Sequence, residues 1–123
     1  MEDWVTARAN CSMVKMFARL QIGIRKDVEI RNGLRRSGDY YVFDVAESDA
    51  ETTVSWQGKD VKKSVRFTRE PNEIIVVDEE GNESRATITL DTSRACLLVV
   101  GGVTMDESHF RQRALERLLF RDM

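Results

Sequence analysis

Apolar residues recur in steps of three or four along the first part of the chain. They are Trp4, Ala7, Cys11, Val14, Phe17, Leu20, Ile24 and Val28. This spacing places them on one face of an α-helix. Asn32-Gly33 then marks a helix end, because both residues tolerate the left-handed backbone conformation. The pattern predicts one long helix over 3–31.

The second half of this segment also alternates between apolar and polar residues, as a half-buried strand does. Gly23 costs a helix about 1 kcal/mol relative to alanine, and the isoleucines favour strands. The alternative is therefore a helix to about Phe17 followed by a strand over roughly 20–31. We favour the continuous helix, because its first half does not alternate and a strand spanning the whole segment would be exceptionally long.

The predicted helix needs tertiary contacts, since an amphipathic helix of this kind gains most of its stability from packing. We expect Val14, Phe17 and Leu20 to face the sheet. The basic side chains expected in water are Arg8, Lys15 and Arg19.

Short stretches with a period of two follow Gly33, separated by turn residues such as Glu80-Gly81-Asn82. This pattern is typical of an antiparallel meander. The six expected strands lie at about 41–45, 54–56, 61–67, 74–77, 86–90 and 96–100.

A second helix is expected at the C-terminal end of the chain. Gly101-Gly102 ends the last strand, and Thr104 to Glu107 has the Thr-x-x-Glu form of a capping box. The pattern predicts a helix that begins at Thr104 and runs to about Phe120. Arg111 falls within its apolar face, so we expect either imperfect packing there or a side-chain stem that lies across an apolar surface.

These elements predict an α+β fold and a single domain over 1–123, with a long N-terminal helix, a six-stranded antiparallel meander and a C-terminal helix. The apolar side of such a sheet needs a cover, which the two helices provide. If residues 20–31 form a strand instead, seven strands and a C-terminal helix resemble a pleckstrin-homology-like barrel in element order.

Charge and cysteine content bear on which molecules the protein binds and on its cellular location. The 19 basic and 21 acidic residues leave a net charge of −2, which gives no general attraction to polyanions. Cys11 and Cys96 lie far apart in apolar surroundings and outside any Cys-x-x-Cys pair, so we expect reduced, packed thiols. The longest strongly apolar run, 96–100, is too short to cross a membrane. The sequence predicts a cytoplasmic protein.

Catalytic chemistry has little support in the sequence. His109 is the only histidine, and we expect it on the solvent side of its helix. The acidic turn at 78–83 lacks the spacing of a calcium loop, and no glycine-rich phosphate loop occurs. We expect no enzymatic activity, no metal and no cofactor.

Two basic stretches, 25–36 and 59–69, form a candidate surface for an anion or a partner. Its residues are Arg25, Arg31, Arg35, Arg36, Lys62, Lys63 and Arg66. Exposed charges also line ordinary sheet faces and discourage edge pairing. We therefore expect weak binding of nucleic acid or an anionic surface only as an alternative function.

Large apolar side chains form the second candidate set, either as a ligand pocket between sheet and helix or as an interface. They are Trp4, Met13, Met16, Phe17, Phe43, Trp56 and Phe67. Because Trp4, Met13, Met16 and Ile22 widen the helical stripe beyond what one sheet contact requires, we favour a homodimer or a bound protein partner. The leading hypothesis is a non-enzymatic interaction or scaffold domain. A binder of an apolar small molecule or lipid is the alternative.

Overall fold

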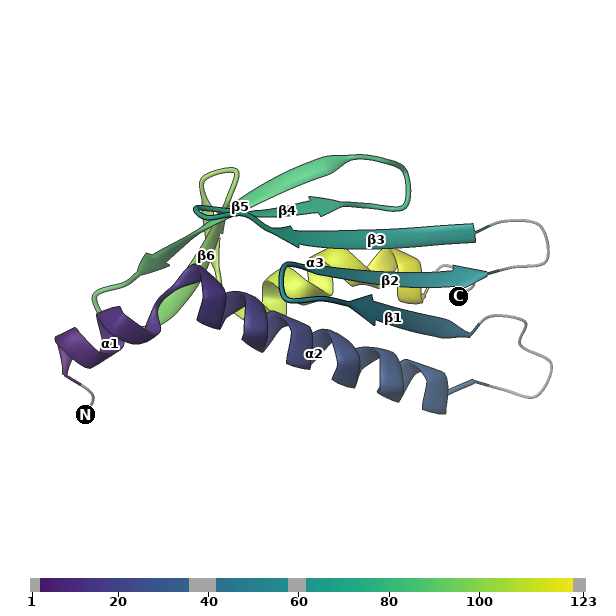
Figure 1. The fold of residues 1–123 in the computed structure, drawn as a ribbon, viewed down its shortest axis with the longest axis horizontal. Coiled ribbons are helices and arrows are strands. Elements are labelled where there is room, and N and C mark those ends of the chain that lie inside the picture. Colours follow the sequence, from purple (N-terminus) through teal and green to yellow (C-terminus); the bar gives the residue numbers. More distant parts are fainter. Residues whose placement is uncertain (1–2, 36–41, 58–61, 121–123) are drawn as a thin grey trace.

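The structure is a computed structural model, and it describes residues 3–35, 42–57 and 62–120. Its helices are α1 (Trp4–Asn10), α2 (Met13–Gly33) and α3 (Glu107–Leu119). Its strands are β1 (Phe43–Glu47), β2 (Glu51–Gln57), β3 (Lys62–Arg69), β4 (Ile74–Val77), β5 (Glu83–Leu90), β6 (Cys96–Val100) and β7 (Val103–Met105). The fold is α+β, with helices at both ends of a meander (Figure 1).

The strands form one antiparallel sheet in the order β1-β2-β3-β4-β5-β6-β7, so each strand pairs with its neighbours in sequence. All six expected strands are present, and β7 is an additional one. In Figure 1, α2 runs alongside β1, and α3 lies behind the central strands. Both helices pack on the sheet through a shared hydrophobic core.

The core follows the alternation of side chains along the strands. Val54 pairs with Val65, and Phe67 pairs with Val76, in the ladders of β2, β3 and β4. All of these side chains are buried. Phe67 also meets Phe110 of α3 edge to face, with ring centroids 6.5 Å apart.

The predicted N-terminal helix is broken into α1 and α2. Ser12 is the N-cap of α2, where its side chain accepts a hydrogen bond from the Lys15 amide at 3.2 Å. The break resets the helical phase, because non-helical residues interrupt the 3.6-residue period. Phe17 and Leu20 are buried as expected, but the prediction for Val14 was wrong, since its side chain is exposed.

Residues 20–31 lie within α2, so the strand alternative was wrong. The pleckstrin-homology-like barrel depended on that strand. Seven strands are present, but the seventh is β7, and β1 and β7 form the two ends of the sheet order. Tertiary packing along the whole length of α2 outweighs the low helix propensity of Gly23 and the isoleucines.

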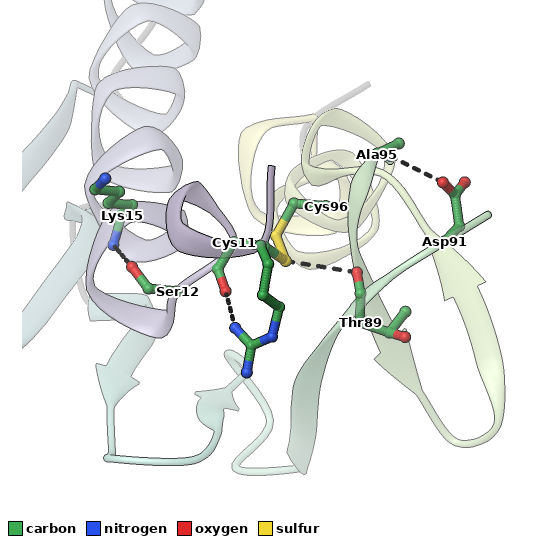
Figure 2. The surroundings of a disulfide bond; sticks show 8 residues. Cys11, Ser12, Lys15, Thr89, Asp91, Ala95 and Cys96 are labelled. Carbon is green, nitrogen blue, oxygen red and sulfur yellow. Dashed lines mark hydrogen bonds between the residues drawn. A yellow bond between two sulfur atoms is a disulfide. The ribbon is translucent and has the colours of Figure 1, made fainter. Parts of the chain in front are cut away.

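Cys11 and Cys96 form a disulfide, which corrects the expectation of reduced thiols. Their Cα atoms are 5.2 Å apart, although 85 positions separate them in the chain. Figure 2 shows the bond joining the α1–α2 junction to the start of β6. Cys11 is buried, so the bond fixes the helix junction against the sheet.

The start of the C-terminal helix was also predicted wrongly. Gly101 and Gly102 have φ angles of 56° and 80°, and they reverse the chain so that Val103 pairs with Val100. Positive φ at both central residues is the geometry of a tight hairpin turn. Thr104 therefore belongs to β7, and α3 begins at Glu107 after Asp106 as N-cap.

Candidate docking groove between helices α2 and α3

Helices α2 and α3 lie side by side and leave a groove of about 360 Å³ between the end of α2 and the outer side of α3. Apolar lining comes from both helices and from the C-cap residue that follows each of them. These residues are Ile30, Leu34, Leu115, Leu119 and Phe120. The polar and charged lining consists of Asp27, Arg31, Ser108, Arg111, Gln112 and Glu116. We call this surface the α2–α3 groove.

Gly23 allows the two helices to approach each other at one end of the groove. A Cβ atom at this position would lie 1.8 Å from Nη1 of Arg111. Arg111 crosses α2 at this point and donates a hydrogen bond from Nε to Asp27 Oδ2 at 2.6 Å. Its Nη1 donates to Glu107 Oε1 at 2.7 Å. The absence of a side chain at Gly23 therefore makes room for an ion-pair network that joins α2 to α3.

Burial shifts the ionisation of this network. Desolvation raises the pKa of Glu107 above its usual value, although the nearby Arg111 charge acts in the opposite direction. Desolvation by itself would lower the pKa of Arg111, but the hydrogen bond to Asp27 and the Glu107 charge outweigh it and raise that pKa. The guanidinium therefore stays charged and holds both carboxylates.

Arg31 closes the other end of the groove from inside the fold. Its side chain is buried, and Nε donates a hydrogen bond to the Leu119 carbonyl oxygen at 2.6 Å. The guanidinium carbon lies 5.3 Å from the ring centroids of both Phe43 and Phe120. A cation at the carboxyl end of α3 is favourable for the helix dipole. Arg31 thus anchors the end of α3 to α2 and β1.

The rim of the groove exposes apolar side chains to solvent. Ile30 is 52% exposed, Leu34 is 63% exposed and Phe120 is 43% exposed. Arg19, Lys26 and Ile30 are seven and four residues apart, so they lie on one stripe of α2. Arg19 and Lys26 are exposed, while the opposite wall on α3 carries the exposed Glu116. Neither Arg19 nor Lys26 lines the groove itself, whose charged lining is Asp27 and Arg31 on α2 and Arg111 and Glu116 on α3.

The predicted basic residues are divided among several surfaces. Arg25 of α2 forms an ion pair with Glu47 of β1, and Arg31 is buried. Arg66 is exposed on β3, where it pairs in register with Thr53 and lies on the opposite sheet face from Val65. Of the other candidates, Lys62 and Arg35 are exposed, Lys63 is partly buried, and Arg36 lies outside the described residues.

The predicted apolar set is mostly core. Its buried members are Met13, Met16, Phe17, Phe43, Trp56 and Phe67, and they pack in one cluster. Trp4 differs, because it is 64% exposed on α1. The candidate pocket between sheet and helix is therefore occupied by these side chains themselves, and the α2–α3 groove lies elsewhere, between the two helices.

Ile30, Leu34 and Phe120 were missed as site residues. Their spacing from the core residues of α2 and α3 leaves them just outside each buried stripe, which periodicity alone assigns to solvent. The available signals were Gly23 within a helix and Arg111 within an apolar face. Each is anomalous locally, and together they mark the place where the helices meet.

Among the described residues, no helix is long and apolar enough to cross a membrane. The same part of the chain has no group of three or more His, Cys, Asp or Glu side chains that could hold a metal ion. Comparison with known proteins finds no matching family model, curated protein or solved structure. A functional proposal for this chain must therefore rest on the geometry of its surfaces.

Proposed function

We propose that this chain is a non-enzymatic interaction domain that self-associates through the α2–α3 groove. The observation that carries the proposal is the combination of a hollow with projecting apolar side chains on one surface. Ile30 and Leu34 stand exposed beside the cavity that they line. A surface that has both projecting side chains and a cavity can be complementary to the same surface of a second copy, as a two-fold symmetric interface requires.

The charges favour one arrangement of the two copies. Placing α2 against α2 would oppose the cationic stripe of Arg19 and Lys26 to itself, and like charges facing each other are unfavourable. Placing α2 of one copy over α3 of the other brings Lys26 towards Glu116. Lys26, beside the groove, and Glu116, which lines it, then form two complementary pairs, one on each side of the two-fold axis.

The geometry of the structure gives less support to the alternative functions. An apolar ligand between sheet and helix would have to displace Phe17 and Phe67, which are both buried in the core. Binding of nucleic acid through the two basic stretches would need Arg25 and Arg66 on one surface. Arg25 is instead paired with Glu47 of β1.

The disulfide bears on the cellular compartment in which the protein is found. A cytoplasmic location was expected together with reduced thiols, but Cys11 and Cys96 are bonded. Disulfides persist mainly in oxidising compartments. The disulfide therefore counts against the cytoplasmic expectation.

Multi-angle light scattering of the oxidised chain at micromolar concentration tests the proposal. We expect the mass of a dimer, and a monomer for Leu34→Asp, which introduces a charge at the rim of the groove. Ile22→Asp is the matched control, because Ile22 is a 58% exposed residue of the same helix that does not line the groove. It should leave the dimer intact.

A monomeric wild-type chain at every concentration would disprove self-association. The α2–α3 groove would then have to bind a different protein. Equal effects of Leu34→Asp and Ile22→Asp would disprove the role of the groove. Circular dichroism of both variants verifies the fold, which should persist because both side chains are exposed.

A further inference from the structure

The disulfide is located at the junction between the short helix α1 and the rest of the fold. Cys11 is the C-cap residue of α1, and its amide donates to the carbonyl oxygens of Ala7 and Arg8 at 3.1 and 3.2 Å. Nη1 of Arg8 donates in turn to the Cys11 carbonyl oxygen at 3.3 Å. Cys11 therefore completes the last turn of α1, and its bond to Cys96 fixes that turn to β6 (Figure 2).

Helix α1 has few other contacts that hold it in place. The structure describes all of its residues from Trp4 to Asn10, and Ala7 is the one that is buried. Trp4 and Val5 project into solvent. A helix of this length is marginal in water by itself, because its few hydrogen bonds do not offset the cost of nucleation. When Cys11 is not fixed, α1 should therefore fray or detach at low cost.

The rest of the fold positions both cysteines without the help of the bond. Among the described residues, the hydrophobic core includes Met13 at the start of α2 but neither Ala7 nor Cys11. Cys96 packs against the same core and pairs with Leu90 in the β5–β6 ladder. Reduction should therefore leave α2 and the sheet folded and the two cysteines near each other, so that the bond can form again.

The exposure of Cys96 and the weak attachment of α1 give a small reductant access to the bond. Cys96 is only partly buried, in contrast to Cys11. A cavity of about 330 Å³ lies beside the junction, and its lining includes Arg8 and Cys11 on one side and Pro71 of the β3–β4 turn on the other. Weakly held elements such as α1 also open locally while the remaining fold stays intact.

We infer that the Cys11–Cys96 bond is a reversible redox site, and that its reduction by a small dithiol releases α1 from the rest of the fold. A thiolate of the dithiol attacks the sulfur of Cys96, and Cys11 leaves as a thiolate that takes up a proton. The second thiol then attacks the mixed disulfide, which frees Cys96 and closes the disulfide of the reductant. Two electrons and two protons thus pass to the protein. The α2–α3 groove lies at the other end of α2, so the inference does not depend on self-association.

Hydrogen exchange of the full chain, measured by mass spectrometry with and without dithiothreitol under native conditions, tests the inference. In the reduced protein we expect the amides of 7–11 to exchange about tenfold faster or more, whereas α2 amides from Leu20 to Ile24 keep their protection. Oxidised dithiothreitol should restore the slow exchange. Equal exchange of 7–11 in both states would overturn the inference. Loss of protection in α2 together with α1 would also overturn it, because the bond would then support the whole fold.

A thiol measurement and a variant separate the effect of the bond from other effects of the reductant. Alkylation with iodoacetamide should label both cysteines after native treatment with dithiothreitol and neither cysteine in the oxidised chain. A bond that is reduced only in urea would overturn the inference, because a switch must respond in the folded protein. The double variant Cys11→Ala, Cys96→Ala should show fast exchange of 7–11 with and without dithiothreitol, and slow exchange there would overturn the role of the bond.

Discussion

Replacing Gly23 with alanine tests whether the close approach of Arg111 joins α3 to α2. An added Cβ would lie 1.8 Å from Nη1 and 2.5 Å from Cζ of Arg111, so the guanidinium must move. Moving it breaks the hydrogen bonds to Asp27 and Glu107. The same substitution removes a glycine from a helix interior, which by itself is favourable. The two effects therefore oppose each other.

The sizes of these two effects determine whether Gly23→Ala raises or lowers the free energy of unfolding. The gain in helix propensity is about 1 kcal/mol. Hydrogen bonds to charged groups contribute about 1.5–3 kcal/mol, and we take a net value of about 2 kcal/mol because the 34% exposure of the Asp27 side chain weakens its share. Gly23→Ala should therefore lower the free energy of unfolding by about 1 kcal/mol in the wild-type background. In an Arg111→Ala background it should raise that free energy by about 1 kcal/mol.

Urea denaturation of the four proteins in this cycle, all with the disulfide intact, measures the coupling of about 2 kcal/mol. Gly33→Ala is the control, because a Cβ at that position of α2 meets nothing within 4 Å. It should show no coupling to Arg111→Ala. If Gly23→Ala stabilises both backgrounds equally, the contact does not hold the helices together.

Three further substitutions or treatments test other parts of the fold. Leu118→Ala removes a fully buried side chain of α3 and should lower stability by about 2–5 kcal/mol in urea denaturation; an unchanged midpoint would mean that α3 is not docked. Reduction of the Cys11–Cys96 bond opens a loop of 85 residues and should cost up to about 4.5 kcal/mol by loop entropy, whereas a Cys11→Ala, Cys96→Ala variant should not respond to reductant. Asp106→Ala should lower the melting temperature of the protein and Thr104→Ala should hardly change it, since the Asp106 side chain accepts the His109 amide at 2.8 Å. That hydrogen bond lowers the pKa of Asp106 below its usual 3.8. The stabilisation of the fold by the Asp106 carboxylate is therefore present above this pH and is lost as the pH falls through the lower folded-state pKa. A Thr104→Ala effect larger than that of Asp106→Ala would contradict the observed cap.

The parts of the fold that follow from local pattern could be predicted from the sequence. Alternation around Val54 and Val65 identified paired strands, and the apolar spacing from Phe17 to Val28 identified α2. The break before α2 was missed because the apolar spacing continues across Cys11 into the next helix. The start of α3 was missed because Gly101-Gly102 was interpreted as a strand end, whereas positive φ angles make it a hairpin turn.

The candidate groove could not be predicted, because it depends on the tertiary placement of two helices. Gly23 and Arg111 were each noted as unfavourable in their own element, one as a poor helix former and the other as a charge in an apolar face. The structure shows that each explains the other, since Arg111 lies over the space that Gly23 leaves. Residue spacing within one element contains no information about such a pair.

Charge exchange between Lys26, beside the groove, and Glu116, which lines it, tests the central proposal most directly. In the proposed dimer, Lys26 of one copy faces Glu116 of the other. Lys26→Glu and Glu116→Lys should therefore each be monomeric alone, because each would oppose like charges twice. A mixture of the two variants restores opposite charges on both sides, so sedimentation velocity should detect a dimer in the mixture alone. A mixture that stays monomeric beside a dimeric wild-type chain, or single variants that dimerise as the wild type does, would contradict the proposed interface.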